Sequence, residues 1–158
     1  MNNQKEFEQT LPGKVSGAGV LCTNTEGKVL IVVPTYKPEW EIPGGTVESN
    51  ESPKQACIRE VREELGIEIP IGRLLRLNYR EETEHVGELL LFLFDGGELS
   101  SEQIASIKLP PDELSNFHFL TTDEIREKTL PSLHQLVESG LAQRQLNQTG
   151  YTEYSKPV

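Results

Sequence analysis

The stretch GGTVESNESPKQACIREVREELGI, residues 44–67, contains a helix whose two ends are both marked in the sequence. Ser52 is a suitable N-cap, Pro53 suits the first helical position, and Gln55 stands three residues after the cap, where it completes a capping box. Gly66 can adopt the left-handed conformation that ends many helices. The sequence therefore predicts a helix that begins at Pro53 and stops before Gly66.

Three glutamates, Glu60, Glu63 and Glu64, crowd the C-terminal part of this helix, where the macrodipole disfavours negative charge. Because they stand three and four residues apart, their carboxylates are expected to project toward one region of space. Each like-charge pair at this spacing costs only about 0.2–0.5 kcal/mol, so an ordinary acidic surface would also be tolerated. The loop before the helix favours a different interpretation.

That loop contains the glycine pair Gly44 and Gly45, at which the backbone can approach a ligand closely. A backbone carbonyl at this point, together with several carboxylates, forms the all-oxygen environment that Mg²⁺ or Mn²⁺ prefers. Bound cations would relieve the repulsion between the glutamates and would attract a polyphosphate. The pattern therefore favours a metal site for phosphate chemistry.

The other face of the helix is apolar. Ile58, Val61 and Leu65 cluster there at 100° per residue and are expected to pack on a sheet. Short apolar segments bounded by turn residues predict the strands of that sheet. These segments are residues 15–23, 28–34, 69–80, 87–97 and 116–120.

Residues 121–139 read as helix, with Thr122 as a candidate N-cap and Pro131 dividing the segment into two pieces. A chain of 158 residues has the usual size of one domain. Strands on both sides of a central helix, followed by further helices, predict an α/β fold with a central mixed β-sheet.

The composition of the chain narrows its function classes. A net charge of -10 argues against a general affinity for nucleic acid, because phosphate backbones are bound through clustered Lys and Arg. No apolar run approaches the roughly 18 residues that span a bilayer, and the N-terminal residues lack the features of a secretory signal. We therefore expect a cytoplasmic protein without a membrane partner. Cys22 and Cys57 lack zinc-site spacing and are expected to be buried, reduced thiols.

A spacing pattern runs through the whole stretch. Gly45 is followed after five residues by Glu51, and seven further residues lead to the run REVREELGI. This pattern resembles the complete Nudix box of the Nudix hydrolase family, and the preceding WEIPGG is also typical of that family. The resemblance implies a Nudix-type α/β/α sandwich over residues 13–140. The polar character of the two ends predicts a flexible N-terminus over residues 1–12 and a mobile C-terminal tail over residues 141–158.

The resemblance also implies roles for individual residues. Arg59 resembles the box arginine that orients a glutamate through a charge-assisted hydrogen bond, and it belongs with Glu63 and Glu64 among the expected catalytic residues. Glu51 is expected to support the loop or the metal shell from outside. The positions that correspond to the family's metal ligands are Gly44, through its carbonyl, Glu60, Glu63 and Glu64. The implied cofactor is Mg²⁺ or Mn²⁺.

The general base has more than one candidate. In some relatives it is a glutamate of the box, which here would be Glu63, and in others it is an acidic residue on a distant loop. The loop LPPDELSNF offers Asp112 and Glu113 for the second arrangement. Because Pro-Pro-Asp is also ordinary turn chemistry, a turn without a catalytic role remains the alternative for both residues.

The substrate is less well defined by the sequence. Tyr36 and Trp40 precede the glycine pair, where an aromatic face could stack on a base, although Trp40 could equally anchor its loop as a buried side chain. Arg73, Arg76 and Arg80 recur at spacings of three and four along one predicted strand, so they do not all face the same side and cannot form one phosphate clamp.

The resemblance implies a Mg²⁺-dependent pyrophosphohydrolase, a monomer or homodimer, that acts on a small-molecule nucleotide. Its substrate would be a nucleoside triphosphate, ADP-ribose or a nucleotide sugar, cleaved by metal-assisted attack of water on phosphorus. The alternative is a non-catalytic, regulatory Nudix-like module that binds a nucleotide. A third class, isomerases of isoprenoid diphosphates, is expected to depart from the standard box, and this sequence does not.

Overall fold

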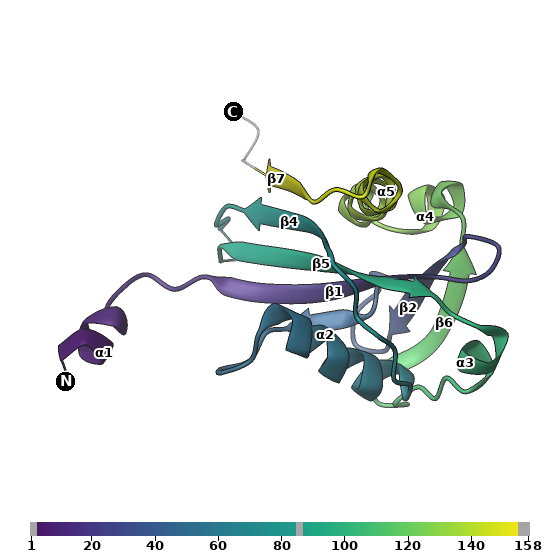
Figure 1. The fold of residues 1–158 in the computed structure, drawn as a ribbon, viewed down its shortest axis with the longest axis horizontal. Helices are drawn as coiled ribbons and strands as arrows, with labels where there is room; N and C mark the ends of the chain where they lie inside the picture. The colour runs from purple at the N-terminus through teal and green to yellow at the C-terminus, as the bar shows by residue number, and fades with distance from the viewer. Residues whose placement is uncertain (1–2, 85–86, 155–158) are drawn as a thin grey trace.

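The computed structural model describes residues 3–84 and 87–154 of the chain (Figure 1). In these residues seven strands form one sheet in the order β6-β2-β1-β5-β4-β7, with β3 paired to β1 beside this path. The strands are β1 (Val15–Thr23), β2 (Val29–Pro34), β3 (Gly44–Thr46), β4 (Leu74–Arg80), β5 (Leu89–Glu98), β6 (Leu114–Leu120) and β7 (Gly150–Tyr154). The pairs β1–β5 and β4–β7 are parallel and the others antiparallel, so the sheet is mixed, as predicted.

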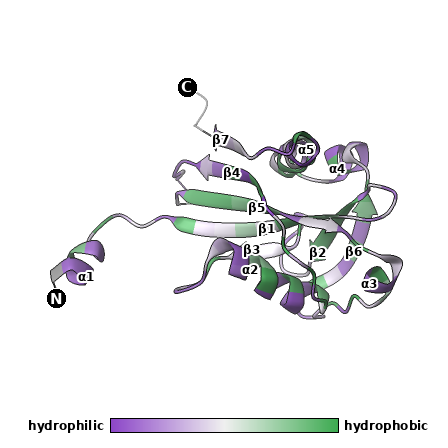
Figure 2. Ribbon diagram, viewed as in Figure 1, coloured by the Kyte–Doolittle hydropathy of each residue, from purple (hydrophilic) through white to green (hydrophobic). Residues whose placement is uncertain are grey.

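Helices cover both faces of the sheet (Figure 1). Besides α1 (Asn3–Glu8), they are α2 (Pro53–Glu60) with its π-helical last turn η1 (Val61–Leu65), α3 (Ser101–Ala105), α4 (Thr122–Lys128) and α5 (Pro131–Leu146). The predicted α/β/α sandwich is confirmed. In Figure 2, β5 is hydrophobic along much of its length, as expected of an interior strand that is covered on both sides.

The two sides of the sheet carry two separate cores, and β1 contributes to both. Val20 and Cys22 pack with the residues of α2, whereas Leu21 between them packs on the opposite side with Leu136 and Val137 of α5. Side chains of a strand alternate between faces, so one strand serves both layers. Strand β1 therefore fixes the box helix and α5 relative to each other.

Helix α2 has the predicted ends. The Ser52 side chain accepts a hydrogen bond from the N–H of Gln55, the reciprocal bond of the capping box is present, and Gly66 ends the helix in the left-handed conformation. One prediction for its apolar face was wrong, because Ile58 is 40% exposed. The small residues Ala56 and Cys57 are fully buried in its place, and they allow the helix to lie close to β1.

The C-terminal helices also begin differently from the prediction. Thr121, rather than Thr122, caps α4 by accepting a hydrogen bond from the N–H of Glu124, so the predicted cap was one residue late. Pro131 divides the segment as predicted and is the first residue of α5. Either threonine could serve as the cap by residue type, and the choice is made by where β6 ends.

The segment predicted to be a mobile tail contains regular structure. Residues 141–146 continue α5, and β7 adds a parallel strand to the edge of the sheet beside β4. Arg73 donates to the carbonyls of Gln143 at 2.6 Å and Gln148 at 2.5 Å, and so satisfies acceptors at the end of α5. An edge strand needs few apolar residues, which is why composition did not reveal β7. Residues 155–158 lie outside the described part of the chain.

The N-terminal segment contains α1, which stands away from the sheet (Figure 1). Its Phe7 is exposed, whereas the following strand β1 enters the interior of the domain. The predicted flexibility of residues 1–12 stays a prediction, and residues 1–2 lie outside the described part. No helix among the described residues has the length and apolar character needed to cross a membrane.

We expect Ser52→Ala to lower the free energy of unfolding by about 1 kcal/mol, because an N–H at the start of α2 would lose its acceptor. Urea denaturation followed by circular dichroism measures this change. Ser49→Ala, on the same exposed loop, is the control and should have little effect. Equal stability of the two variants would show that the cap contributes nothing.

Candidate active site

The glycine pair lets the box helix and the sheet meet at close range. Gly44 and Gly45 lie on β3, opposite Gly19 and Ala18 of β1. A Cβ atom on Gly44 would collide with the carbonyl of Ala18, and a Cβ on Gly45 would collide with the carboxylate of Glu60. Only glycine leaves room for a carboxylate against this strand.

Glu64 makes the second contact between the helix and β3. The N–H of Gly44 donates to Oε2 of Glu64 at 2.9 Å. Burial raises the pKa of this carboxyl to about 8, and the charges of Glu60, Glu41 and Glu113 act in the same direction, while the hydrogen bond from Gly44 opposes them. Glu64 is therefore held in place by Gly44, while the charges that shift its pKa are those of other acids.

Arg59 organises the other carboxylates. Its Nε and Nη2 donate to the two oxygens of Glu51 at 2.9 and 3.0 Å, and its Nη1 donates to Glu60 at 2.7 Å and Glu63 at 3.0 Å. A bond from Nη2 to the carbonyl of Thr46, at 3.0 Å, ties the same guanidinium to β3. The orienting role predicted for Arg59 thus has a geometric basis in five hydrogen bonds.

Glu51 supports this cluster from outside. The paired bond from Arg59, and a further bond from the N–H of Glu48 at 3.0 Å, lower the pKa of its carboxyl. For Glu60, burial raises the pKa although the bond from Arg59 opposes the shift. Glu63 is the most exposed of the box glutamates, with 55% of its side chain accessible. The three box glutamates therefore occupy different environments despite their regular spacing.

Two acids from outside the helix act on the cluster through their charges. Glu113 and Glu41 both raise the pKa of Glu64 through their charges. The loop before β6 is fixed by Thr35, whose N–H donates to the carbonyl of Glu113 at 2.8 Å and whose hydroxyl donates to that of Asp112 at 2.7 Å. Of the two predicted loop acids, Glu113 is thus the one whose charge acts on the box glutamates.

Sequence reasoning missed Glu41. Its backbone forms an isolated bridge with Val32 of β2, and its carboxylate pairs with Lys37 at 2.6 Å. The available signal was its position three residues before Gly44, but only the antiparallel bridge to β2 turns the loop toward the glutamates. No local pattern in the sequence specifies that bridge.

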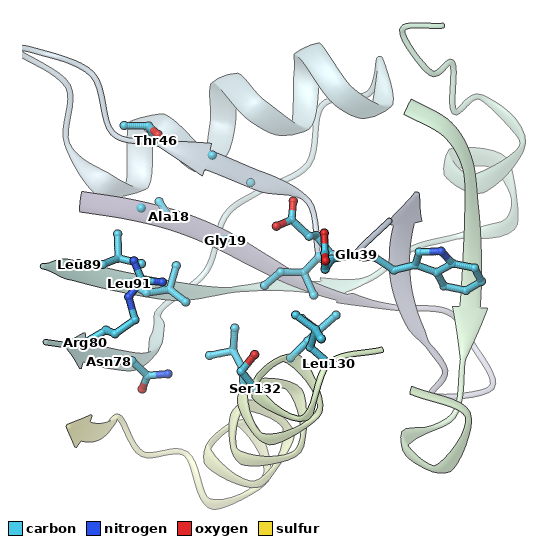
Figure 3. A pocket seen from close by; sticks show the side chains of 18 of the residues that line it. Ala18, Gly19, Glu39, Thr46, Asn78, Arg80, Leu89, Leu91, Leu130 and Ser132 are labelled. Atoms are coloured by element: carbon cyan, nitrogen blue, oxygen red, sulfur yellow. The ribbon is translucent and has the colours of Figure 1, made fainter. Parts of the chain in front are cut away.

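A cavity of about 650 Å³ lies between the sheet and α5 (Figure 3). Its border includes Gly44 and Gly45, the strand residues that contact Glu64 and Glu60 on their other side. The remaining wall is largely apolar, with Leu89 and Leu91 on one side and Leu130 on the other. The glutamates and the cavity therefore share the glycine strand as a common boundary.

Both predicted aromatic residues line this cavity. Tyr36 is 70% exposed at its edge, whereas Trp40 packs against the core on the α5 side and stacks on His118 with ring centroids 4.9 Å apart. One face of Trp40 is thus already occupied. The anchoring role weighed for this residue is present in the structure, and a contact with substrate stays a prediction.

Comparison with known proteins identifies the family. The sequence model of the NUDIX domain matches residues 13–139. The chain belongs to the Nudix family. A curated MutT-like protein of Streptomyces ambofaciens is 35% identical over 104 residues, a match that covers 64% of this Nudix chain and 66% of the relative, just under two thirds of its length.

A second relative is more fully covered. The CTP pyrophosphohydrolase of Escherichia coli is 31% identical over 105 residues, which are 62% of this chain and 78% of that protein. Among solved structures, the MutT protein of Methanosarcina mazei superposes with a TM-score of 0.68 at 22% identity, over 89% of this chain and all of the other. That likeness concerns the Nudix fold alone.

The box residues suit a divalent cation in their chemistry but are not grouped around a single point. Within residues 3–84 and 87–154 no three acidic, His or Cys side chains converge closely enough to hold a metal ion by themselves. Arg59 occupies the space between Glu60 and Glu63, and Glu64 is turned onto Gly44. The donors are nevertheless all oxygen, as Mg²⁺ requires, and none of the ion pairs formed by the described residues involves Glu64.

The raised pKa of Glu64 makes metal-free stability depend on pH. The folded state keeps the proton of Glu64 up to about pH 8, whereas the unfolded chain loses it near its ordinary pKa, so this contribution to stability is complete at low pH and is lost as pH rises toward 8. We expect Glu64→Gln to become more stable relative to wild type between pH 5 and 8.5, by up to about 4 kcal/mol.

Urea denaturation at a series of pH values in EDTA measures this difference. The control is Glu68→Gln, since the Glu68 side chain is 80% exposed and forms an ion pair with Arg62 on the surface. Its curve should run parallel to that of wild type. A parallel curve for Glu64→Gln as well would mean that Glu64 is not strained by its surroundings.

Proposed function

We propose that this Nudix protein is a metal-dependent pyrophosphohydrolase that cleaves a phosphoric anhydride bond in a small nucleotide. The observation that carries the proposal is the shared boundary: Gly44 and Gly45 border the cavity on one side and touch Glu64 and Glu60 on the other. A nucleoside in the cavity would present its phosphates to the glutamates across this strand. The names of its pyrophosphohydrolase relatives support the same reaction.

The size and lining of the cavity support a nucleoside as the bound group. A volume of about 650 Å³ lies within the range of about 300–1,000 Å³ that is usual for small-molecule sites. Its apolar leucines suit a base and ribose better than a phosphate. The substrate class that follows is a nucleoside triphosphate or another nucleoside diphosphate derivative.

The acidic residues require a cation to hold a polyphosphate. Glu60, Glu63 and Glu64 would hold Mg²⁺ or Mn²⁺, and the carbonyl of Gly44 is a further proposed ligand. When bound, the cation neutralises phosphate charge and lowers the pKa of a coordinated water. Arg59 keeps Glu60 and Glu63 oriented, because its guanidinium bonds both and is itself anchored to Glu51 and β3.

Hydrolysis of a nucleoside triphosphate would form one P–O bond from water and break one P–O bond to the leaving phosphate. A carboxylate must accept the proton that the water loses. Glu63 in the box and Glu113 on the loop before β6 are the two candidates that we favour, since the charge of Glu113 raises the pKa of Glu64 and the Glu63 side chain is accessible. Asp112 becomes the weaker candidate, because the charge of Glu113, and not that of Asp112, is among those that raise the pKa values of Glu60 and Glu64.

We expect Glu63→Gln and Glu64→Gln each to lower kcat by about 10²–10⁴-fold, the usual range for a general acid or base, with the fold intact. The measurement is a panel of nucleoside triphosphates, ADP-ribose and nucleotide sugars with Mg²⁺, and the products are identified by chromatography. Glu68→Gln should retain full activity. Binding of a nucleotide without turnover anywhere in the panel would favour the regulatory, non-catalytic alternative.

We also expect Mn²⁺ or Mg²⁺ to raise the melting temperature at pH 8, because a ligand that binds only the folded state stabilises it by mass action. A cation at ten times its Kd contributes about 1.4 kcal/mol. The rise should be reduced in Glu64→Gln and retained in Glu68→Gln. A melting temperature that no divalent cation changes, with or without a nucleotide, would count against the metal site.

A further inference from the structure

The cavity has a polar end that the proposed hydrolysis does not use. Asn78 and Arg80 of β4 line it, beside Leu91 and Leu89 of β5 (Figure 3). Asn78 is paired in register with Leu91, and Arg80 with Leu89, so all four side chains point to the α5 side of the sheet. Two polar side chains thus lie over an apolar floor, away from the box glutamates.

The arrangement of the arginines agrees with the spacing argument from the sequence, because Arg73, Arg76 and Arg80 do not all face one side. Arg76 and Arg80 are separated by an even number of residues and share one side of the strand. Arg73, which precedes the strand, is used instead at the end of α5. Arg76 is buried and donates to Thr152 of β7. It also donates to Oδ1 of Asn78 and so helps to orient that side chain.

The guanidinium of Arg80 has donors that the described residues do not fully satisfy. Its Nη2 donates to the carbonyl of Gly87 at the long distance of 3.4 Å, and its buried Nε has no hydrogen-bond partner within the described part of the chain. Among residues 3–84 and 87–154, no carboxylate lies within ion-pair distance of this guanidinium. A partly buried charge without a partner is costly, and an acceptor from a ligand would offset that cost.

Asn78 adds a second donor to the same wall. Only 4% of it is exposed, and its Oδ1 is turned toward Nη2 of Arg76 at 3.5 Å. That orientation leaves the amide nitrogen as the group directed into the cavity, as Figure 3 also shows. The polar end therefore presents donors from Arg80 and Asn78 and needs acceptors from its ligand.

We propose that Asn78 and Arg80 select the base of the substrate by binding two adjacent hydrogen-bond acceptors on its edge. Guanine offers such a pair at N7 and O6, and cytosine at O2 and N3, and an arginine fork matches either. Adenine places its amino group beside N1 and N7, and its N3 is a single acceptor without an adjacent one, while uracil places an N–H between its two carbonyls. The inference rests on the proposed function only in assuming that the cavity holds the nucleoside.

The affinity of nucleoside monophosphates, measured by calorimetry in EDTA, tests the inference without requiring catalysis. We expect GMP or CMP to bind about tenfold or more tightly than both AMP and UMP, since one bidentate contact discriminates by at least that order. The 7-deaza analogue of GMP, which lacks the N7 acceptor, separates the two sources. It should bind weakly if guanine is the ligand.

Arg80→Met should remove this preference, and Arg80→Lys should not restore it, because an ammonium keeps the charge but lacks the fork. The control is Arg126→Met, on the surface of α4, where the arginine pairs with Asp123. If Arg80→Met does not fold, Arg80→Lys carries the test. Thermal melting of each variant separates loss of the fold from loss of recognition.

The inference is overturned if the four monophosphates bind equally, if none binds, or if Arg80→Met weakens all four by the same factor. The last result would assign Arg80 to the phosphate instead. Failure of the proposed function looks different: wild type would keep its preference for GMP or CMP in EDTA and yet hydrolyse no nucleotide with Mg²⁺.

Discussion

The contact between Glu60 and the bare Cα of Gly45 is the constraint on which the site depends. Because no Cβ stands at that position, a carboxylate from the helix can lie directly against β3, and one turn later Glu64 can accept the N–H of Gly44. The same strand borders the cavity. Gly44 and Gly45 thus have the glutamates on one side of β3 and the apolar cavity on the other.

The electrostatics of the cluster follow from an imbalance of charge. Arg59 is a single guanidinium that serves Glu51, Glu60 and Glu63, so it cannot also neutralise Glu64. Glu51 accepts two parallel hydrogen bonds from Arg59, and such a bidentate pair is the strongest type among these contacts. The shortage of positive charge is therefore concentrated on Glu64, whose pKa is raised to about 8 by burial. This imbalance of charge is the physical basis for the cation that we propose at the site.

Local signals in the sequence were sufficient to predict helix α2 and the residues that cap it. Ser52, Gln55 and Gly66 act within a few residues of themselves, so their roles follow from residue type and spacing. The burial of Ala56 and Cys57 in place of Ile58 could not be found in this way, because it depends on how closely the helix approaches β1. Periodicity gives a direction for a helix face but not its distance from the sheet.

Residues that reach the site through long-range strand pairing could not be predicted from the sequence. Glu41 reaches the cluster through a bridge to β2, and Arg80 reaches the cavity through its register with β5, and neither pairing has a short-range signature. The fixed spacing of the box, by contrast, specified the glutamates and Arg59 before any contact was known. The part of the site carried by one continuous segment was predictable, whereas the part assembled from several strands was not.

Strand β7 also has a consequence for how the protein is made. It is translated long after β4, and until it docks, the outer edge of β4 is unpaired and the guanidinium of Arg76 lacks Thr152. A growing chain would therefore expose an open strand edge beside the nascent cavity, a feature that invites pairing with other chains. Strand β7 completes the wall behind Asn78, so the cavity acquires its shape only after β7 has paired with β4.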